Sequence, residues 1–240
     1  MDKIQTGNLI FLDIETVPGN PDFQSLPDVW QELWNKKVAR LVPEGITPED
    51  FYSQQSALYA EFGRVVCICI GYYRSDGTER KLRVKALAYD DEAKILKQFN
   101  EMITQFENHH KNWIFAGHNI REFDLPYLSR RMLINGLDIP QSMSFQKLKP
   151  WDIPVFDTMH FWRFVGDYRN YTSLDLLATA LGIPSPKEDI NGSQVAEVFY
   201  KEKNLKRIAA YCSRDVVCVA NIVRKLNREP LLAEEQIEMV

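Results

Sequence analysis

The chain has 240 residues, of which 45% are hydrophobic and 26% charged, and its 29 Lys and Arg residues against 33 Asp and Glu residues give a formal net charge of −4. This balance excludes a broadly basic nucleic-acid-binding surface but leaves room for local basic patches. No apolar run is long enough to span a bilayer and the N-terminus has no signal-peptide pattern, so we expect a cytoplasmic globular protein with no membrane association. The four cysteines fit neither a metal knuckle nor a disulfide framework and are expected to be reduced core residues.

The first part of the chain predicts a strand, a helical segment and a hairpin. The apolar run over Leu9–Glu15 predicts a buried strand. The residues that follow, about 19–61, are too many for a plain loop, and "TPED" within them is typical of a helix start. We therefore expect a helical insertion there. Runs 65–73 and 82–89, separated by an Asp-Gly turn signal, predict an antiparallel hairpin.

Short strands and helices alternate in the rest of the chain. A strand is expected over 113–119. The spacing of apolar residues predicts helices over 90–110, 124–136, 172–182, 193–204 and 205–226. Antiparallel strands come first and the alternation follows, which favours an α/β fold with a sheet of mixed direction flanked by helices. We expect a single domain over residues 1–240.

Two carboxylates stand at the end of the first predicted strand, in "NLIFLDIETV". Strand side chains alternate between faces, so Asp13 and Glu15 point the same way, about 7 Å apart along the chain. Like charges on one face repel each other. They are tolerated if the strand end is solvated or if a cation lies between them. Sites form at the carboxyl ends of strands in open α/β sheets, which favours the cation.

A third acid, Asp124, stands at the start of the next predicted helix, in "AGHNIREFDLPYL". A helix N-cap is the simpler interpretation of this aspartate, and a contribution to the same site is the other. His118 has no second histidine at ligand spacing, so we expect it to form hydrogen bonds at the strand end rather than bind a metal. Asp157, in "VFDT", is a further acid at an expected strand end and is predicted to be structural.

Tyr211 and Asp215, in "YCSRDVV", are four residues apart and share one face of the last predicted helix. Ile208, Val219 and Ile222 fall on the same stripe, which should meet the sheet. A Tyr–Asp pair on the surface is the alternative interpretation. An aspartate on a buried stripe is costly unless it is paired or binds a metal, which favours a site.

The three segments together supply four carboxylates: Asp13, Glu15, Asp124 and Asp215. Mg²⁺ and Mn²⁺ prefer oxygen ligands, and two such ions about 4 Å apart can promote an in-line phosphoryl displacement. We therefore predict that the four acids are catalytic and bind two divalent ions, Mg²⁺ or Mn²⁺. The ordinary pKa of tyrosine makes Tyr211 a poor general base, so we expect it to orient the attacking water.

The set "FLDIET", "NIREFD" and "YCSRD" resembles the three motifs of the DEDD 3′–5′ exonucleases, and Tyr211 before Asp215 resembles their tyrosine subclass. The segment "EFGRVVCICIGYY" looks like part of the stand-alone relatives of the proofreading domain of family B DNA polymerases. The resemblance implies a ribonuclease H-like fold with a five-stranded sheet whose first three strands are antiparallel. It also implies removal of nucleoside monophosphates from the 3′ ends of single-stranded nucleic acid, with DNA favoured over RNA.

The resemblance further implies contacts to the substrate. The residues expected to contact the terminal nucleotides are Ile14, Thr16, Asn119, Phe123 and Ser173. Four aromatic residues could stack on bases or lie in the core: Trp151, Trp162, Tyr168 and Tyr171. Because the net charge is negative, the phosphates must be attracted by bound metal and by local cations such as Arg121, Arg130 and Arg131. A protein partner from DNA repair or replication is also expected.

Two other functions are compatible with parts of the sequence. Haloacid dehalogenase-like phosphohydrolases also begin with a strand that ends in two acids, and "DIETV" resembles that motif. It differs in having Glu15 as the second acid, and no clear paired-aspartate motif follows. A non-catalytic nucleic-acid-binding scaffold would be expected to lack at least one carboxylate, and all four are present. The exonuclease is favoured over both alternatives.

Overall fold

The structure is a computed structural model that describes residues 3–76, 79–164, 171–185 and 189–240. Within these ranges six strands form one sheet in the order β5-β4-β1-β2-β3-β6. The strands are β1 (Leu9–Pro18), β2 (Gly63–Asp76), β3 (Glu79–Ala88), β4 (Ile114–Gly117), β5 (Val155–Asp157) and β6 (Ile237–Met239). The helices are α1 (Asp28–Val38), α2 (Pro48–Gln55), α3 (Glu92–His109), α4 (Asp124–Ile134), α5 (Thr158–Trp162), α6 (Leu174–Ala180), α7 (Val195–Glu197) and α8 (Leu205–Leu226).

The sheet has mixed direction, as the sequence predicts. Strands β1, β2 and β3 are antiparallel neighbours, and β4 and β5 are added in parallel beside β1. The described ranges contain one strand more than the five expected. This extra strand, β6, pairs in parallel with β3 through Leu82 and Ile237. The Ile-Glu-Met segment of β6 is too short for its alternation to signal a strand, so the sequence did not reveal β6.

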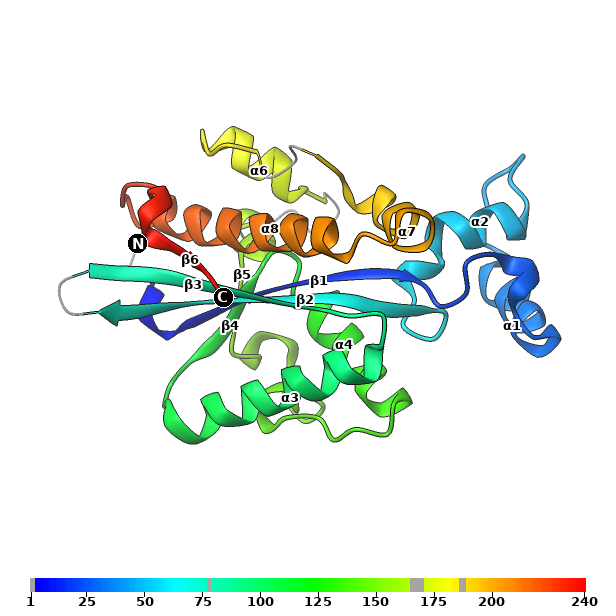
Figure 1. The fold of residues 1–240 in the computed structure, drawn as a ribbon, viewed down its shortest axis with the longest axis horizontal. Helices are drawn as coiled ribbons and strands as arrows, with labels where there is room; N and C mark the ends of the chain where they lie inside the picture. The colour runs from blue at the N-terminus through cyan, green and yellow to red at the C-terminus, as the bar shows by residue number, and fades with distance from the viewer. Residues whose placement is uncertain (1–2, 77–78, 165–170, 186–188) are drawn as a thin grey trace.

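Helices cover both faces of the sheet (Figure 1). The long helix α8 lies on one face, with α6 and α7 on the same side, and α3 and α4 lie on the other. The alternation of β1 explains the division: Phe11 packs in the core that contains Val216 of α8, and Leu12 in the core that contains Phe99 of α3. None of the helices in the described ranges combines the length and the apolar character needed to cross a membrane.

The residues between β1 and β2 form a helical unit with its own aromatic core. Trp34 of α1 is fully buried, and its indole N–H donates to the carbonyl of Pro48 at 2.8 Å. The rings of Tyr52 and Phe62 meet Trp34 edge-on, with centroid distances of 5.2 and 5.0 Å. The residues 19–61 are therefore helical, as the sequence predicts, and their description as an insertion into one domain stays a prediction.

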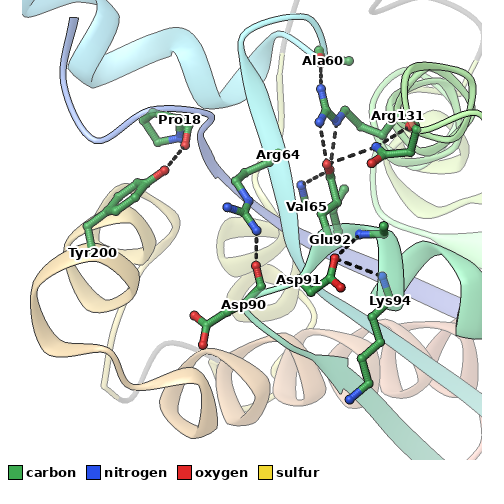
Figure 2. A network of polar contacts seen from close by, with 12 residues as sticks. Pro18, Ala60, Arg64, Val65, Asp90, Asp91, Glu92, Lys94, Arg131 and Tyr200 are labelled. Atoms are coloured by element: carbon green, nitrogen blue, oxygen red, sulfur yellow. Dashed lines mark hydrogen bonds and ion pairs between the residues drawn. The ribbon is translucent and has the colours of Figure 1, made fainter. Parts of the chain in front are cut away.

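A buried ion pair joins this helical unit to helices α3 and α4 (Figure 2). Glu92, the first residue of α3, accepts hydrogen bonds from the Val65 N–H at 2.7 Å and from Nε of Arg131 at 2.8 Å. Nη1 of Arg131 donates to the carbonyl of Ala60 at 2.7 Å. The Glu92 and Arg131 side chains are 8% and 11% exposed. Arg131 thus forms a buried ion pair with Glu92 and is not available to attract phosphates, contrary to expectation.

Strand β4 turns away from β1 after only a few residues. Its last pair with β1 joins Phe11 and Ala116, whereas β1 continues to Pro18. A Cβ atom on Gly117 would lie 2.8 Å from the carbonyl oxygen of Leu12, so glycine is needed where the chain turns away this closely. Beyond Phe11, β1 pairs with β2 alone among the strands of the described ranges. This divergence opens the sheet beside the predicted acids.

Candidate active site

A cleft of about 490 Å³ lies beside β1, where β4 has turned away. The predicted acids and Tyr211 all line it, and they come from three elements: Asp13 and Glu15 from β1, Asp124 from α4, and Tyr211 and Asp215 from α8. The other lining residues are Ile14, Leu58, His118, Asn119, Phe123, Tyr171, Ser173, Leu174, Asp175 and Gly192. A larger cavity of about 810 Å³ lies between the helical unit and the start of α3, and no predicted catalytic, metal or nucleotide-contact residue lines it.

Asp13 and Glu15 leave the same face of β1, as the alternation predicts. They stand opposite Cys69 and Cys67 of β2, two residues that belong to the core on the α8 side of the sheet. The ladder slips by one residue directly after Glu15 and leaves Val66 of β2 without an opposite residue. The two acids thus lie in the part of β1 that is paired with β2 before the slip, and they point toward α8.

Asp124 is the first residue of α4, and its Oδ1 accepts a hydrogen bond from the Ile14 N–H at 3.1 Å. The N-cap interpretation is wrong, because Phe123 occupies that position and no side chain caps the helix. Burial, followed by the negative charges of Asp157 and Asp215, raises the pKa of Asp124 to about 7, although hydrogen bonds from main-chain N–H groups act in the opposite direction. Asp124 therefore joins α4 to β1 where β1 lacks a second strand neighbour.

Tyr211 and Asp215 lie on the stripe of α8 that meets the sheet, with 5% and 8% of their surfaces exposed. The two side chains lie one helical turn apart on α8. Burial, followed by the negative charges of Asp215, Glu15 and Asp13, raises the pKa of Tyr211 well above its usual value. Tyr211 is therefore protonated at neutral pH.

The gathered acids form a site suited to hard divalent cations. Burial, followed by the charge of Asp215, raises the pKa values of Asp13 and Glu15 well above their usual range. Ligand atoms of Asp13, Glu15 and Cys212 all lie within 4.8 Å of one another. A cation bound here would relieve the repulsion among the carboxylates, and carboxylate oxygens are the ligands that Mg²⁺ and Mn²⁺ prefer. The donor set therefore fits a divalent metal ion.

Four of the five predicted substrate contacts line the cleft: Ile14, Asn119, Phe123 and Ser173. Ser173 also caps α6 by accepting a hydrogen bond from the Leu176 N–H at 3.2 Å. The fifth, Thr16, does not line the cleft, and its hydroxyl donates to the carbonyl of Ala57 at 2.9 Å. Thr16 lies beyond the slip in the β1–β2 ladder and contacts the helical unit instead.

His118 and Asp157 support the cleft through hydrogen bonds, as the sequence predicts. Nε2 of His118 lies 2.7 Å from the carbonyl oxygen of Thr172. The Asp157 carboxylate accepts hydrogen bonds from the N–H groups of Asn119 and Arg121, both at 3.1 Å. These contacts hold the chain between β4 and α4 against the end of β5.

The sequence missed two polar contributors to the cleft. Cys212, expected only as a core residue, has its sulfur 3.2 Å from Oδ2 of Asp13. Its position directly after Tyr211 was the available clue. Asp175 lines the cleft and accepts a hydrogen bond from the Ser185 hydroxyl. An acid in the first turn of a helix is common, so Asp175 carries no distinguishing signal in the sequence.

The four aromatic candidates have different positions. Tyr171 lines the cleft and is 66% exposed. Trp151 and Trp162 are partly or largely exposed but do not line the cleft. Tyr168 lies outside the described residues. Only Tyr171, among the described candidates, is placed to meet a molecule in the cleft.

A family model described as "Predicted 3'-5' exonuclease related to the exonuclease domain of PolB" matches residues 56–221. This range includes Asp124, Tyr211 and Asp215, and it begins after Asp13 and Glu15. No match was found among curated proteins.

The fold is similar to that of the family B DNA polymerase from the hyperthermophilic archaeon Pyrobaculum calidifontis, with a TM-score of 0.53 and 17% sequence identity. The similarity covers 91% of this chain and 24% of the polymerase, so the chain spans about a quarter of that protein's length. The mixed sheet flanked by helices is thus the ribonuclease H-like fold that was expected. The family match favours the exonuclease over the phosphohydrolase and scaffold alternatives. The chain belongs to the family of predicted 3′–5′ exonucleases related to the exonuclease domain of PolB.

Proposed function

We propose that the protein is a metal-dependent 3′–5′ exonuclease that removes nucleoside monophosphates from the 3′ end of single-stranded nucleic acid, with DNA favoured over RNA. The observation that carries this proposal is the convergence of four carboxylates and one tyrosine from β1, α4 and α8 in a single cleft. The description of the family supports the reaction class.

Asp13, Glu15, Asp124 and Asp215 would hold two divalent ions, Mg²⁺ or Mn²⁺. When bound, such ions supply an acidified water and stabilise negative charge on the leaving oxygen of the phosphodiester. The protein's part is to hold the acids together. Strand β1 presents two acids from one face, and α4 and α8 each bring another against it. The Ile14 N–H binds one oxygen of Asp124 and leaves the second oxygen for a ligand.

Tyr211 orients the attacking water and does not take its proton. The raised pKa keeps the Tyr211 hydroxyl protonated. The lone pairs of the same hydroxyl remain able to accept a hydrogen bond from water. In this role Tyr211 fixes the position of the water.

Aromatic and cationic side chains near the acids suit a single strand. Phe123 and Tyr171 line the cleft, and unpaired bases can stack on such rings. Arg121 and Arg130 line a separate apolar groove of about 320 Å³ along α4, the helix that begins with Asp124. Neither guanidinium has an ion-pair partner in the described ranges, so both are free to bind phosphates.

We also propose that the protein acts in the cytoplasm on 3′ ends that arise in DNA repair or replication, together with a protein partner. The similarity to a polymerase over about a quarter of that polymerase's length supports this part of the proposal.

The test is digestion of a 5′-labelled single-stranded DNA and of its RNA counterpart, with Mn²⁺ or Mg²⁺, beside an Asp13→Ala control and a reaction with excess chelator. We expect a descending ladder and released nucleoside monophosphates, both absent in the control and with chelator. The faster substrate reveals the sugar preference. The absence of a ladder on both strands, or cleavage that persists in chelator, would refute the proposal.

A further inference from the structure

A thiol forms a hydrogen bond with one of the proposed metal-binding acids. The sulfur of Cys212 is 3.2 Å from Oδ2 of Asp13 and 3.4 Å from the main-chain carbonyl oxygen of the same residue. These two residues are 199 positions apart in the sequence, and Cys212 is fully buried. The S–H group is the donor, and the main-chain carbonyl and the ionised carboxylate accept.

Two further cysteines share the buried core in which this thiol packs. Cys69 and Cys67 stand opposite Asp13 and Glu15 in the β1–β2 ladder and belong to the same core cluster as Cys212. The Cys69 thiol in turn contacts the Ser213 hydroxyl at 3.5 Å. Among the hydrogen bonds of the described residues, Cys212 is the one of these three cysteines that reaches a carboxylate.

We propose that Cys212 is a positioning residue: its S–H group binds one oxygen of Asp13 and orients the other toward a divalent ion in the cleft. This inference rests on the proposed exonuclease function. Groups that hydrogen-bond to metal ligands fix the orientation of those ligands, and their loss typically weakens metal binding about 10- to 100-fold. Cys212 performs this task as a neutral donor. A lysine or arginine in its place would neutralise Asp13 and compete with the metal ion.

Two substitutions at the same position separate positioning from packing. Cys212→Ser keeps a donor of similar size, although the shorter C–O bond brings it less close to Asp13. Cys212→Ala removes the donor. Cys218→Ala is the matched control, because Cys218 is also buried on α8 but packs against Leu177 and Ala178 of α6, outside the cleft.

The measurement is calorimetric titration of the full chain with Mn²⁺ in the absence of nucleic acid, accompanied by urea unfolding in chelator. We expect Cys212→Ala to weaken Mn²⁺ binding about tenfold. Cys212→Ser should bind more tightly than the alanine variant, and Cys218→Ala should bind as the wild type does even if it unfolds more easily. With single-stranded DNA, the Mn²⁺ concentration for half-maximal activity should rise in Cys212→Ala, while KM for DNA at saturating Mn²⁺ stays unchanged.

The outcomes distinguish this inference from the proposed function. Wild-type Mn²⁺ affinity in Cys212→Ala, together with lost affinity in Asp13→Ala, would overturn the role of Cys212 and leave the metal site intact. Failure of the wild type itself to bind Mn²⁺ would overturn both. If the alanine variant does not fold, the isosteric pair Cys212→Thr and Cys212→Val gives the same comparison of a donor with none, and equal Mn²⁺ affinities in that pair would overturn the inference.

Discussion

The main-chain N–H of Ile14 donates a 3.1 Å hydrogen bond to Oδ1 of Asp124, a residue 110 positions further along the chain. Ile14 lies between Asp13 and Glu15, so this bond fixes the start of α4 against the strand segment that carries the other two acids. The Asp124 carboxylate therefore stabilises the fold through one oxygen and is available to the proposed metal site through the other.

Replacing Asp124 by asparagine should separate these two roles. The amide oxygen can still accept the Ile14 N–H, and a buried charge is removed, so the free energy of unfolding in chelator should not fall by more than about 1 kcal/mol. Exonuclease activity should fall at least about a hundredfold, because a direct ligand matters more than its outer partners. Urea unfolding and the ladder assay measure the two effects. Asp124→Leu, which loses both roles, is the comparison, and an active Asp124→Asn variant would contradict the assignment.

The metal-free protein should lose stability as the pH rises. Burial raises the pKa of Asp124 to about 7, above the value of about 3.9 in an unfolded chain. Between these values the folded state binds more protons than the unfolded state, so the contribution of Asp124 to stability is full at low pH and is lost as the pH rises through 7. Asp13 and Glu15, whose pKa values are also raised, act in the same direction.

Thermal unfolding in chelator measures this dependence. The Tm of the wild type should fall between pH 5 and pH 8, and the Tm of Asp124→Asn should fall less. Mn²⁺ should raise the Tm more at pH 8 than at pH 5, because the ionised acids bind it better. Identical slopes in the two proteins would show that Asp124 does not titrate in this range.

Removing Arg121 or Arg130 should weaken the binding of single strands without affecting the fold. For every phosphate that a variant no longer binds, the slope of log K against log salt should fall in magnitude by about 0.7. Fluorescence anisotropy with labelled DNA, in an Asp124→Asn background to prevent cleavage, measures both affinity and slope. Arg74→Ala is the control, because Arg74 is exposed near the hairpin end of β2, away from the cleft. Equal losses of DNA affinity in the Arg121, Arg130 and Arg74 variants would contradict specific phosphate contacts and indicate a general effect of the net charge.

Breaking the ion pair between Glu92 and Arg131 should destabilise the protein strongly. Arg131→Met leaves the buried Glu92 carboxylate without its charged partner, which costs about 3–5 kcal/mol. Urea unfolding measures the loss. Lys36→Met, which breaks an exposed pair with Glu32, should cost less than about 1 kcal/mol. Replacing both partners, in Glu92→Leu with Arg131→Met, should recover part of the loss, and a double variant no more stable than Arg131→Met would contradict this account.

Local patterns were enough to predict the residues that gather in the cleft. Asp13 and Glu15 are two apart in a strand, and Tyr211 and Asp215 are four apart in a helix, so the period of each element already places both on one face. The resemblance to known exonuclease motifs then joined these segments to Asp124. The fold class followed from the order of the elements.

Contacts between distant segments were beyond such patterns. Arg131 was expected to meet phosphates, because nothing in its neighbourhood reveals Glu92 39 positions earlier. Thr16 was expected in the cleft, but the slip in the ladder is invisible in the sequence of β1 alone. The thiol of Cys212 reaches Asp13 only because α8 packs across β1 and β2, which is a property of the assembled core.

The one-residue slip directly after Glu15 isolates the acids from the helical unit that joins β1 to β2. From Ile10 to Glu15 the pairing with β2 is continuous, so the ladder holds Asp13 and Glu15 whatever follows them. Beyond that point the unpaired Val66 absorbs any mismatch in length between the two strands. The helical unit can therefore be shortened, extended or exchanged as a separate module, in evolution or by design, while the carboxylates keep their places.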